Sequence, residues 1–282
     1  MTNQLKVLPQ YLIPKQAITA LAGKLASAKA GKLTTAVIRW FVKRYQVNMA
    51  EAAEPNIEAY ESFNEFFTRP LKKGARRITK ADFISPVDGA ISQLGDIKVD
   101  QIFQAKGHHY STLTMLAGNK ELASSFENGH FATLYLSPKD YHRIHMPCDG
   151  TLKSMTYVPG DLFSVNPTTA QGVPGLFARN ERVICEFDSA HGVFVLILVG
   201  ATIVGSMATV WHGVVNPPRV GRITTWTYEN QSITLKQGEE MGRFLLGSTV
   251  VMLFPENTIT FNRTWKPAKP IKLGEKMANA IS

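Results

Sequence analysis

The stretch VICEFDSAHGVFVLILV, residues 183–199, holds two short apolar runs with turn-forming residues between them. Other apolar runs of similar length are separated by Gly, Pro, Asn and Asp, and they cover 90–94, 131–136, 152–158, 223–226 and 250–254. Short strands at such spacing are typical of antiparallel β structure. The sequence therefore predicts a mostly antiparallel β body after Ile84, followed by an irregular polar tail from Asn257.

Positive charge is concentrated at the N-terminal end of the chain. The 282 residues carry a net charge of +9, from 31 Lys and Arg against 22 Asp and Glu. Residues 1–50 contain eight of these cations and no acid, so the rest of the chain is nearly neutral. Because that remainder shows no basic groove, a nucleic-acid partner is not expected.

Apolar residues recur at helical spacing within this basic segment, in two groups: Ile18, Leu21, Ala22 and Leu25, then Leu33, Val37, Trp40 and Phe41. Basic amphipathic helices with aromatic residues are typical of segments that lie in a membrane surface. The alternative is two ordinary helices packed on the body. The helical pattern continues over 51–67, and Pro70, Gly74 and the basic pairs at 72–73 and 76–77 indicate a linker or surface loop. The expected fold class is α+β, with these helices on the β body.

Several protein classes are excluded by composition. No stretch reaches the roughly 20 apolar residues that a membrane-spanning helix needs. The N-terminus lacks the pattern of a secretory signal peptide. The two cysteines, Cys148 and Cys185, cannot form a disulfide framework and lack the spacing of metal ligands. A reducing, cytoplasmic location with no metal site is therefore expected, with both thiols as packing residues.

Three short motifs contain residues that could do chemistry. The first is SPVDG at 85–89, although Asp-Gly alone is a common hairpin turn. The second is DYHRIHMP at 140–147, where two histidines flank an arginine and could transfer protons or bind an anion. The third is FLLGSTVV at 244–251, a Gly-Ser pair that runs into an apolar strand. A GxSxG nucleophile elbow is absent.

Read together, the motifs are more specific. SPVDG, YHRIHMP and GEEMGRFLLGST occur in this order and at these distances in the pyruvoyl-dependent phosphatidylserine decarboxylases, and the chain resembles a bacterial member of that family. The resemblance extends through VPGDLFSVN (158–166), FARNERV (177–183) and VGATIVGS (199–206), and it covers roughly 55–265. One departure is Gln237, which stands before Gly238 where a lysine is expected.

The resemblance implies a precursor that cuts itself between Gly247 and Ser248. Ser248 would become a covalent pyruvoyl group, and the β chain (1–247) and α chain (248–282) would associate as a heterodimer, with a further dimer suggested. The pyruvoyl group would form a Schiff base with phosphatidylserine and accept the electrons released with CO2, giving phosphatidylethanolamine for phospholipid biosynthesis. Residues 56–282 would be the catalytic domain, and 1–55 a segment that associates with an anionic membrane surface. The protein would lie peripherally on the cytoplasmic face of the cell membrane.

Residue roles follow from the same resemblance. His145 would remove the proton from Ser248, and Asp88 would orient its imidazole, as in a charge-relay triad. His142 is the expected proton donor in decarboxylation, because an ordinary histidine pKa near 6.5 suits acid and base work. Tyr135 is a weaker candidate for the same pocket. Arg143 and Arg179 are candidates for binding the lipid head group.

Two other functions remain open on the sequence. A serine hydrolase could use Asp88, His145 and Ser248 as a true triad in an intact chain. A non-enzymatic lipid-binding module would use the N-terminal segment, with the histidines serving only the structure.

Overall fold

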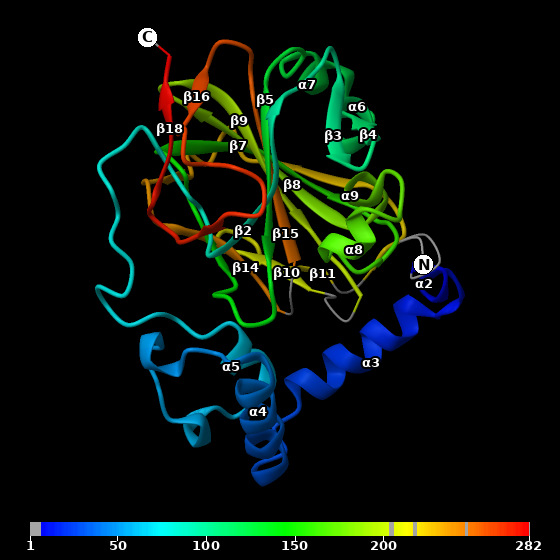
Figure 1. Ribbon diagram of the computed structural model, residues 1–282, viewed down its shortest axis with the longest axis vertical. Coiled ribbons are helices and arrows are strands. Elements are labelled where there is room, and N and C mark those ends of the chain that lie inside the picture. The colour runs from blue at the N-terminus through cyan, green and yellow to red at the C-terminus, as the bar shows by residue number, and fades with distance from the viewer. Residues whose placement is uncertain (1–6, 203–205, 217–218, 246–247, 282) are drawn as a thin grey trace.

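The protein has helices at its N-terminal end and antiparallel sheets in the remainder, as Figure 1 shows. This computed structural model describes residues 7–202, 206–216, 219–245 and 248–281. The α+β prediction is confirmed. Within those described ranges no helix is long and apolar enough to cross a membrane.

The helices are mostly short. They are α2 (Pro9–Leu12), α3 (Lys15–Ser27), α4 (Lys32–Tyr45), α5 (Phe63–Phe67), α6 (Thr112–Met115), α7 (Lys120–Ser124), α8 (Pro167–Ala170) and α9 (Leu176–Arg179). Two single 3-10 turns, η1 (Met49–Glu51) and η2 (Ile57–Ala59), lie between α4 and α5.

Strands make up the body. In chain order they are β1 (Phe83–Ile84), β2 (Gly89–Asp96), β3 (Gln101–Ala105), β4 (His108–Ser111), β5 (His130–Leu136), β6 (Arg143–His145), β7 (Gly150–Val158), β8 (Arg182–Ser189), β9 (Gly192–Val199), β10 (Met207–Thr209), β11 (Gly213–Asn216), β12 (Thr224–Thr227), β13 (Thr234–Leu235), β14 (Glu240–Phe244), β15 (Ser248–Phe254), β16 (Ile259–Phe261), β17 (Pro270–Ile271) and β18 (Lys276–Ala280).

The largest sheet has the order β12-β7-β8-β9-β15-β5-β2-β17, and β13 also pairs with β7. Its strands are antiparallel, and β15 lies in the interior between β9 and β5, with Val251 opposite Ile197 and Thr133. Along β15 the side chains of Val250 and Val251 belong to two different buried clusters, because successive residues face opposite sides of a sheet. Burial on both faces explains why these strands read as unbroken apolar runs.

Two smaller sheets complete the part of the body that holds the motifs. One has the order β11-β10-β14-β6 and pairs the DYHRIHMP strand with the strand that leads toward Ser248. The other, β1-β18-β16, joins the two residues before SPVDG to the C-terminal tail, and β3 pairs with β4 in a separate hairpin. Segments far apart in the sequence thus meet near one end of β15.

The N-terminal helices form a layer beside α5, at the end of the molecule away from β16 and β18 (Figure 1). A small buried cluster holds this layer together, with Ile38 of α4 against Phe66 and Phe67 of α5. The helix α2 lies apart from it and contacts the body, where the Gln10 side chain donates to the Thr169 hydroxyl at 3.1 Å.

Two expectations about local structure differ from the fold. The tail from Asn257 is not irregular, because β16, β17 and β18 pair with one another or with strands of the body. The segment 51–67 is only partly helical, because it is broken into η1, η2 and α5. Asn56 and Ser62 each cap the start of a new turn, and such caps favour short separate helices over one long one.

Candidate active site

Ser248 is the first residue of β15, and its backbone lies opposite Leu136 of β5. Gly247, the residue before the predicted cut, lies outside the described residues, as does the side chain of Ser248. The site is therefore defined by the backbone of Ser248 and by the groups around this end of β15.

His142 lies beside this strand end. Its Nε2 donates to the carbonyl of Ser137 at 3.1 Å, and Ser137 directly follows Leu136, the partner of Ser248. The His142 carbonyl accepts from the backbone N–H of Phe244 at 3.0 Å, four residues before Ser248. The imidazole is thus fixed between the chain that approaches Ser248 and the strand that pairs with it.

The environment of His142 keeps its ring neutral. The residue is fully buried and stacks on Phe67 with ring centroids 4.0 Å apart. Burial, together with the nearby positive charge of Arg69, lowers the pKa of His142 to about 3. Since Nε2 carries the proton that Ser137 accepts, Nδ1 has a free lone pair, and no described residue donates a hydrogen bond to it. A buried unpartnered acceptor is rare in native structures and needs an explanation.

His145 is held at both ring nitrogens. Nδ1 donates to the carbonyl of Gly238 at 2.8 Å, and Nε2 lies 3.0 Å from the Tyr141 hydroxyl, which donates to it. Burial lowers the pKa of His145 and raises that of Tyr141, so the imidazole is neutral and the phenol stays protonated. Nε2 is therefore the basic atom of His145.

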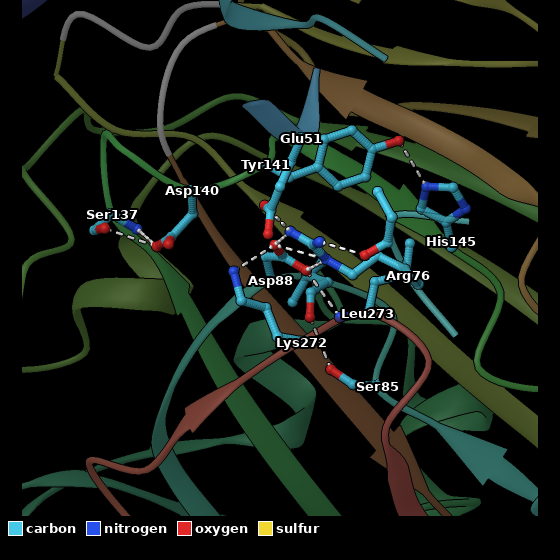
Figure 2. A network of polar contacts seen from close by, with 12 residues as sticks. Glu51, Arg76, Ser85, Asp88, Ser137, Asp140, Tyr141, His145, Lys272 and Leu273 are labelled. Atoms are coloured by element: carbon cyan, nitrogen blue, oxygen red, sulfur yellow. Dashed lines mark hydrogen bonds and ion pairs between the residues drawn. The ribbon is translucent and has the colours of Figure 1, made fainter. Parts of the chain in front are cut away.

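Asp88 is the centre of a buried polar network, shown in Figure 2. Arg76 binds its carboxylate with two nitrogens, one of them Nε at 2.9 Å from Oδ1. Lys272 Nζ lies 3.1 Å from Oδ2, and the backbone N–H of Leu273 donates to Oδ1 at 2.9 Å. Arg76 also pairs with Glu51 at 2.7 Å. Burial alone would raise the pKa of Asp88, but the Arg76 and Leu273 hydrogen bonds outweigh it and lower the pKa.

Close backbone contacts position Asp88 next to the two histidines. A side chain at Gly89 would collide with the carbonyl of Tyr135 on β5, so glycine is required where the SPVDG segment crosses that strand. The backbone N–H of His145 donates to the carbonyl of Pro86 at 2.9 Å. The structure thus brings the SPVDG and YHRIHMP motifs together.

The Asp88 carboxylate and the His145 imidazole are not joined by a hydrogen bond within the described part of the chain. The Gly238 carbonyl accepts the Nδ1–H of His145, the bond that Asp88 is expected to accept. Gly238 follows Gln237, whose side-chain amide donates to the carbonyls of Ala81 and Pro147, so the residue that departs from the family pattern supports the same loop. The orienting role of Asp88 stays a prediction.

The other candidates lie in different surroundings. Arg143 pairs with Glu240 at 2.7 Å and donates to the Thr68 carbonyl, so its guanidinium is engaged within the protein. Arg179 pairs with Asp161 at 3.0 Å and lies over the ring of Phe163. Tyr135 is half-buried and lines a cavity of about 610 Å³.

Sequence reasoning missed the partners of Asp88 and of His145. Arg76 falls in the predicted surface loop and Lys272 in the predicted irregular tail, although both bind the Asp88 carboxylate. Tyr141 lies inside the YHRIHMP motif, and the motif itself was the signal that could have found it. For Arg76 the sequence offers only a basic pair in a loop, which does not indicate a buried ion pair.

Comparison with known proteins gives full-length relatives. A family model described as phosphatidylserine decarboxylase matches residues 63–279, and a model described as PSD matches residues 5–46. The chain is 72% identical over 279 residues to the phosphatidylserine decarboxylase proenzyme of Dechloromonas aromatica, covering 99% of each chain. It is 67% identical over 282 residues to the proenzyme of the same name from Azoarcus sp., covering 100% of this chain and 98% of the relative.

Proposed function

The chain belongs to the phosphatidylserine decarboxylase family, and we propose that it uses a pyruvoyl group made from its own Ser248. It is a carboxy-lyase of phospholipid synthesis that converts phosphatidylserine to phosphatidylethanolamine and CO2, and it is made as a proenzyme. The pyruvoyl group, the position of the cut, the residue roles and the membrane surface are the parts that we propose.

The surroundings of Ser248 fit a small covalent carbonyl group. Ser248 is the first residue of β15 and pairs with Leu136 of β5. The next residue after Leu136, Ser137, accepts a hydrogen bond from His142, whose Nδ1 has no partner among the described residues. This unpartnered buried nitrogen is the single observation that best supports the proposal, because a site for proton transfer needs such an atom. When present, the pyruvoyl group supplies the electron sink that no ordinary side chain provides.

Self-cutting requires a base for the Ser248 hydroxyl. We assign this role to His145 Nε2, which is unprotonated at neutral pH and is oriented by the Gly238 carbonyl on the opposite side of the ring. Because the Tyr141 hydroxyl donates to the one lone pair of Nε2, the Ser248 proton would reach this atom through that hydroxyl or in place of it. Asp88 would act on His145 through its charge, which favours the protonated imidazole that forms when the proton is taken up. The hydroxyl oxygen would then attack the Gly247 carbonyl carbon, so that the peptide bond becomes an ester before the chain separates.

The fold would hold the two chains together after the cut. Residues 248–282 contain β15, which pairs along its length with β5 and β9, and β16 to β18, which pair with strands on both sides of the cut. Lys272 and Leu273 of the α chain also bind Asp88 of the β chain. These contacts support a tightly associated αβ unit.

In decarboxylation we assign the proton transfer to His142 Nδ1. A pKa near 3 means that the resting ring carries no charge, so Nδ1 would first take up a proton from solvent water and later give it to the product carbon. This differs from the ordinary pKa near 6.5 expected from the residue type, and the cause is complete burial.

The N-terminal helices would bring this site to the lipid. Leu25, Leu33 and Trp40 are each 60% or more exposed, and they line an apolar groove of about 490 Å³. Basic residues interleave with them, which favours an anionic membrane surface. A peripheral position on the cytoplasmic face of the cell membrane follows from this proposal.

The direct test replaces Ser248 by alanine. We expect Ser248→Ala to give an intact chain that releases no CO2 from phosphatidylserine, whereas Ser124→Ala, an exposed serine of α7, is cut and active. Hydroxylamine, which reacts with carbonyl groups, should inactivate the unaltered protein. A serine hydrolase would contradict the proposal by showing an intact chain, ester turnover and no sensitivity to hydroxylamine. A lipid-binding module would lose nothing in Ser248→Ala.

A further inference from the structure

We propose that Arg69 forms a subsite for the phosphate of the phosphatidylserine head group. This inference rests on the proposed function. A cavity of about 190 Å³ lies between the end of α4 and the catalytic motifs, and we call it the polar cavity. It is lined by Arg69, Asn48, Asp88, Lys139 and Tyr141, among others.

Arg69 is a buried cation without a counter-ion. Only 4% of the residue is exposed, and within the described residues no carboxylate lies in ion-pair range of its guanidinium. One nitrogen, Nη1, donates to the Phe66 carbonyl at 3.3 Å, whereas Nε is buried with no partner in the described part of the chain. An unpaired buried charge is costly, so a protein that retains one is expected to supply its partner from outside.

The acids of the polar cavity form no ion pair with Arg69, and Glu51 and Asp88 act on it only at longer range. Arg76 binds both Glu51 and Asp88, and Lys272 binds Asp88 as well. The Asp140 carboxylate accepts from the backbone N–H and the hydroxyl of Ser137, at 2.7 Å each. Arg69 therefore has positive charge to offer an anion, and Lys139, which is exposed and forms no ion pair among the described residues, adds another cation at the rim of the cavity.

The position of the polar cavity suits a lipid head group. Tyr141 lines it and contacts His145 through its hydroxyl, and the charge of Arg69 reaches His142, whose pKa it helps to lower. Arg69 follows α5, whose Phe67 stacks on His142. A phosphate held at Arg69 would therefore lie close to both histidines, within reach of the groups that act on the serine part of the lipid.

The apolar groove borders the same two helices. It is lined by Leu33, Val37 and Phe41 of α4 and by Phe63 of α5, whereas residues just after α4 and α5 line the polar cavity. Acyl chains in the groove and a phosphate at Arg69 would match the two ends of one phospholipid. Guanidinium also suits phosphate better than ammonium does, because its planar fork can donate two parallel hydrogen bonds.

The test uses the purified, cut enzyme and a short-chain phosphatidylserine dispersed in detergent, so that membrane binding does not limit the rate. We expect Arg69→Gln to raise KM about tenfold or more, as loss of a charged hydrogen bond implies, with a smaller change in kcat and complete self-cutting. Arg69→Lys should recover part of this loss. Arg263→Gln, which removes an exposed arginine, is the control and should leave KM unchanged. An unchanged KM in Arg69→Gln overturns the inference.

Competition on the unaltered enzyme tests the same site without relying on a variant that folds. Glycerophosphoserine should compete with the substrate, inorganic phosphate should compete much more weakly, and both effects should weaken in Arg69→Lys. Failure of glycerophosphoserine to compete would overturn the subsite, and equal competition by inorganic phosphate would mark a site for free phosphate instead. If the unaltered enzyme releases no CO2 from phosphatidylserine, the proposed function fails rather than the subsite alone.

Discussion

The N-terminal helices and the large sheet use the same apolar residue types in opposite ways. In β15, Val250 to Phe254 are completely buried between two layers. In α3 and α4, Leu25 and Leu33 are each 66% exposed, beside basic residues. Apolar burial within the protein stabilises the interior of a sheet. Clustered apolar residues that stay exposed indicate a surface that binds a partner or a membrane. This contrast supports our proposal that the body holds the chemistry and that the helices contact lipid.

The largest expected effect comes from a residue of the β body, because self-cutting should depend on the body and not on the N-terminal helices. Replacing His145 by alanine would remove the proposed base for Ser248, and we expect the rate of self-cutting to fall by about 10²–10⁴-fold. The check is gel or mass analysis of freshly purified protein, with Arg263→Gln as the control. Near-normal cutting would refute the role of His145. Substitutions of exposed residues in α3 and α4 should not change the extent of self-cutting.

We propose that His142 acts in decarboxylation and not in self-cutting, so a variant at this position should separate the two reactions. In His142→Ala we expect complete self-cutting but turnover of dispersed phosphatidylserine lowered by about 100-fold or more, because Nδ1 is then missing. The measurement is CO2 release per mole of cut enzyme. Loss of both self-cutting and turnover would mean that His142 acts in both reactions. Normal self-cutting with normal turnover would mean that it acts in neither.

The helices should matter for lipid surfaces and not for chemistry. Changing Leu25, Leu33 and Trp40 together to glutamine removes apolar area that would enter the membrane, so we expect binding to anionic vesicles to fall about tenfold or more. Deleting residues 1–50 should remove binding altogether. Cosedimentation with vesicles measures this, and Val214→Gln, an exposed apolar residue of β11, serves as the control. Unchanged binding in the deletion would refute the membrane surface.

The last effect concerns stability and the buried ring of His142. Its folded pKa of about 3 lies below the unfolded value near 6.5, so the unfolded chain binds the additional proton between these values. Stability is therefore full above pH 6.5 and is lost as the pH falls, by up to about 1.4 kcal/mol per pH unit. Urea unfolding of Ser248→Ala, which stays one chain, should show a shallower pH dependence once His142→Gln is added. Equal slopes would contradict the burial argument.

The long strands of the β body could be predicted because each of them is a continuous apolar run in the sequence. The strands of the tail could not, because they are short and pair with distant partners, as Ala278 does with Phe83. In the structure Asp88, His142 and His145 lie in one region, as the motifs predict, whereas their roles stay predictions. The ion pairs of Asp88 were not predictable, since one partner lies 12 positions away and another 184. The isolation of Arg69 appears only when every nearby acid is seen to be engaged.

The measurement that tests the central claim most directly is the mass of the denatured, purified protein. The account predicts two chains, with the C-terminal chain of 35 residues beginning at position 248 and lighter by one ammonia than the same peptide with an N-terminal serine. That mass difference would place the pyruvoyl group at Ser248. A single chain of 31.2 kDa in an active preparation would contradict the account, because activity would then need no cut and no pyruvoyl group.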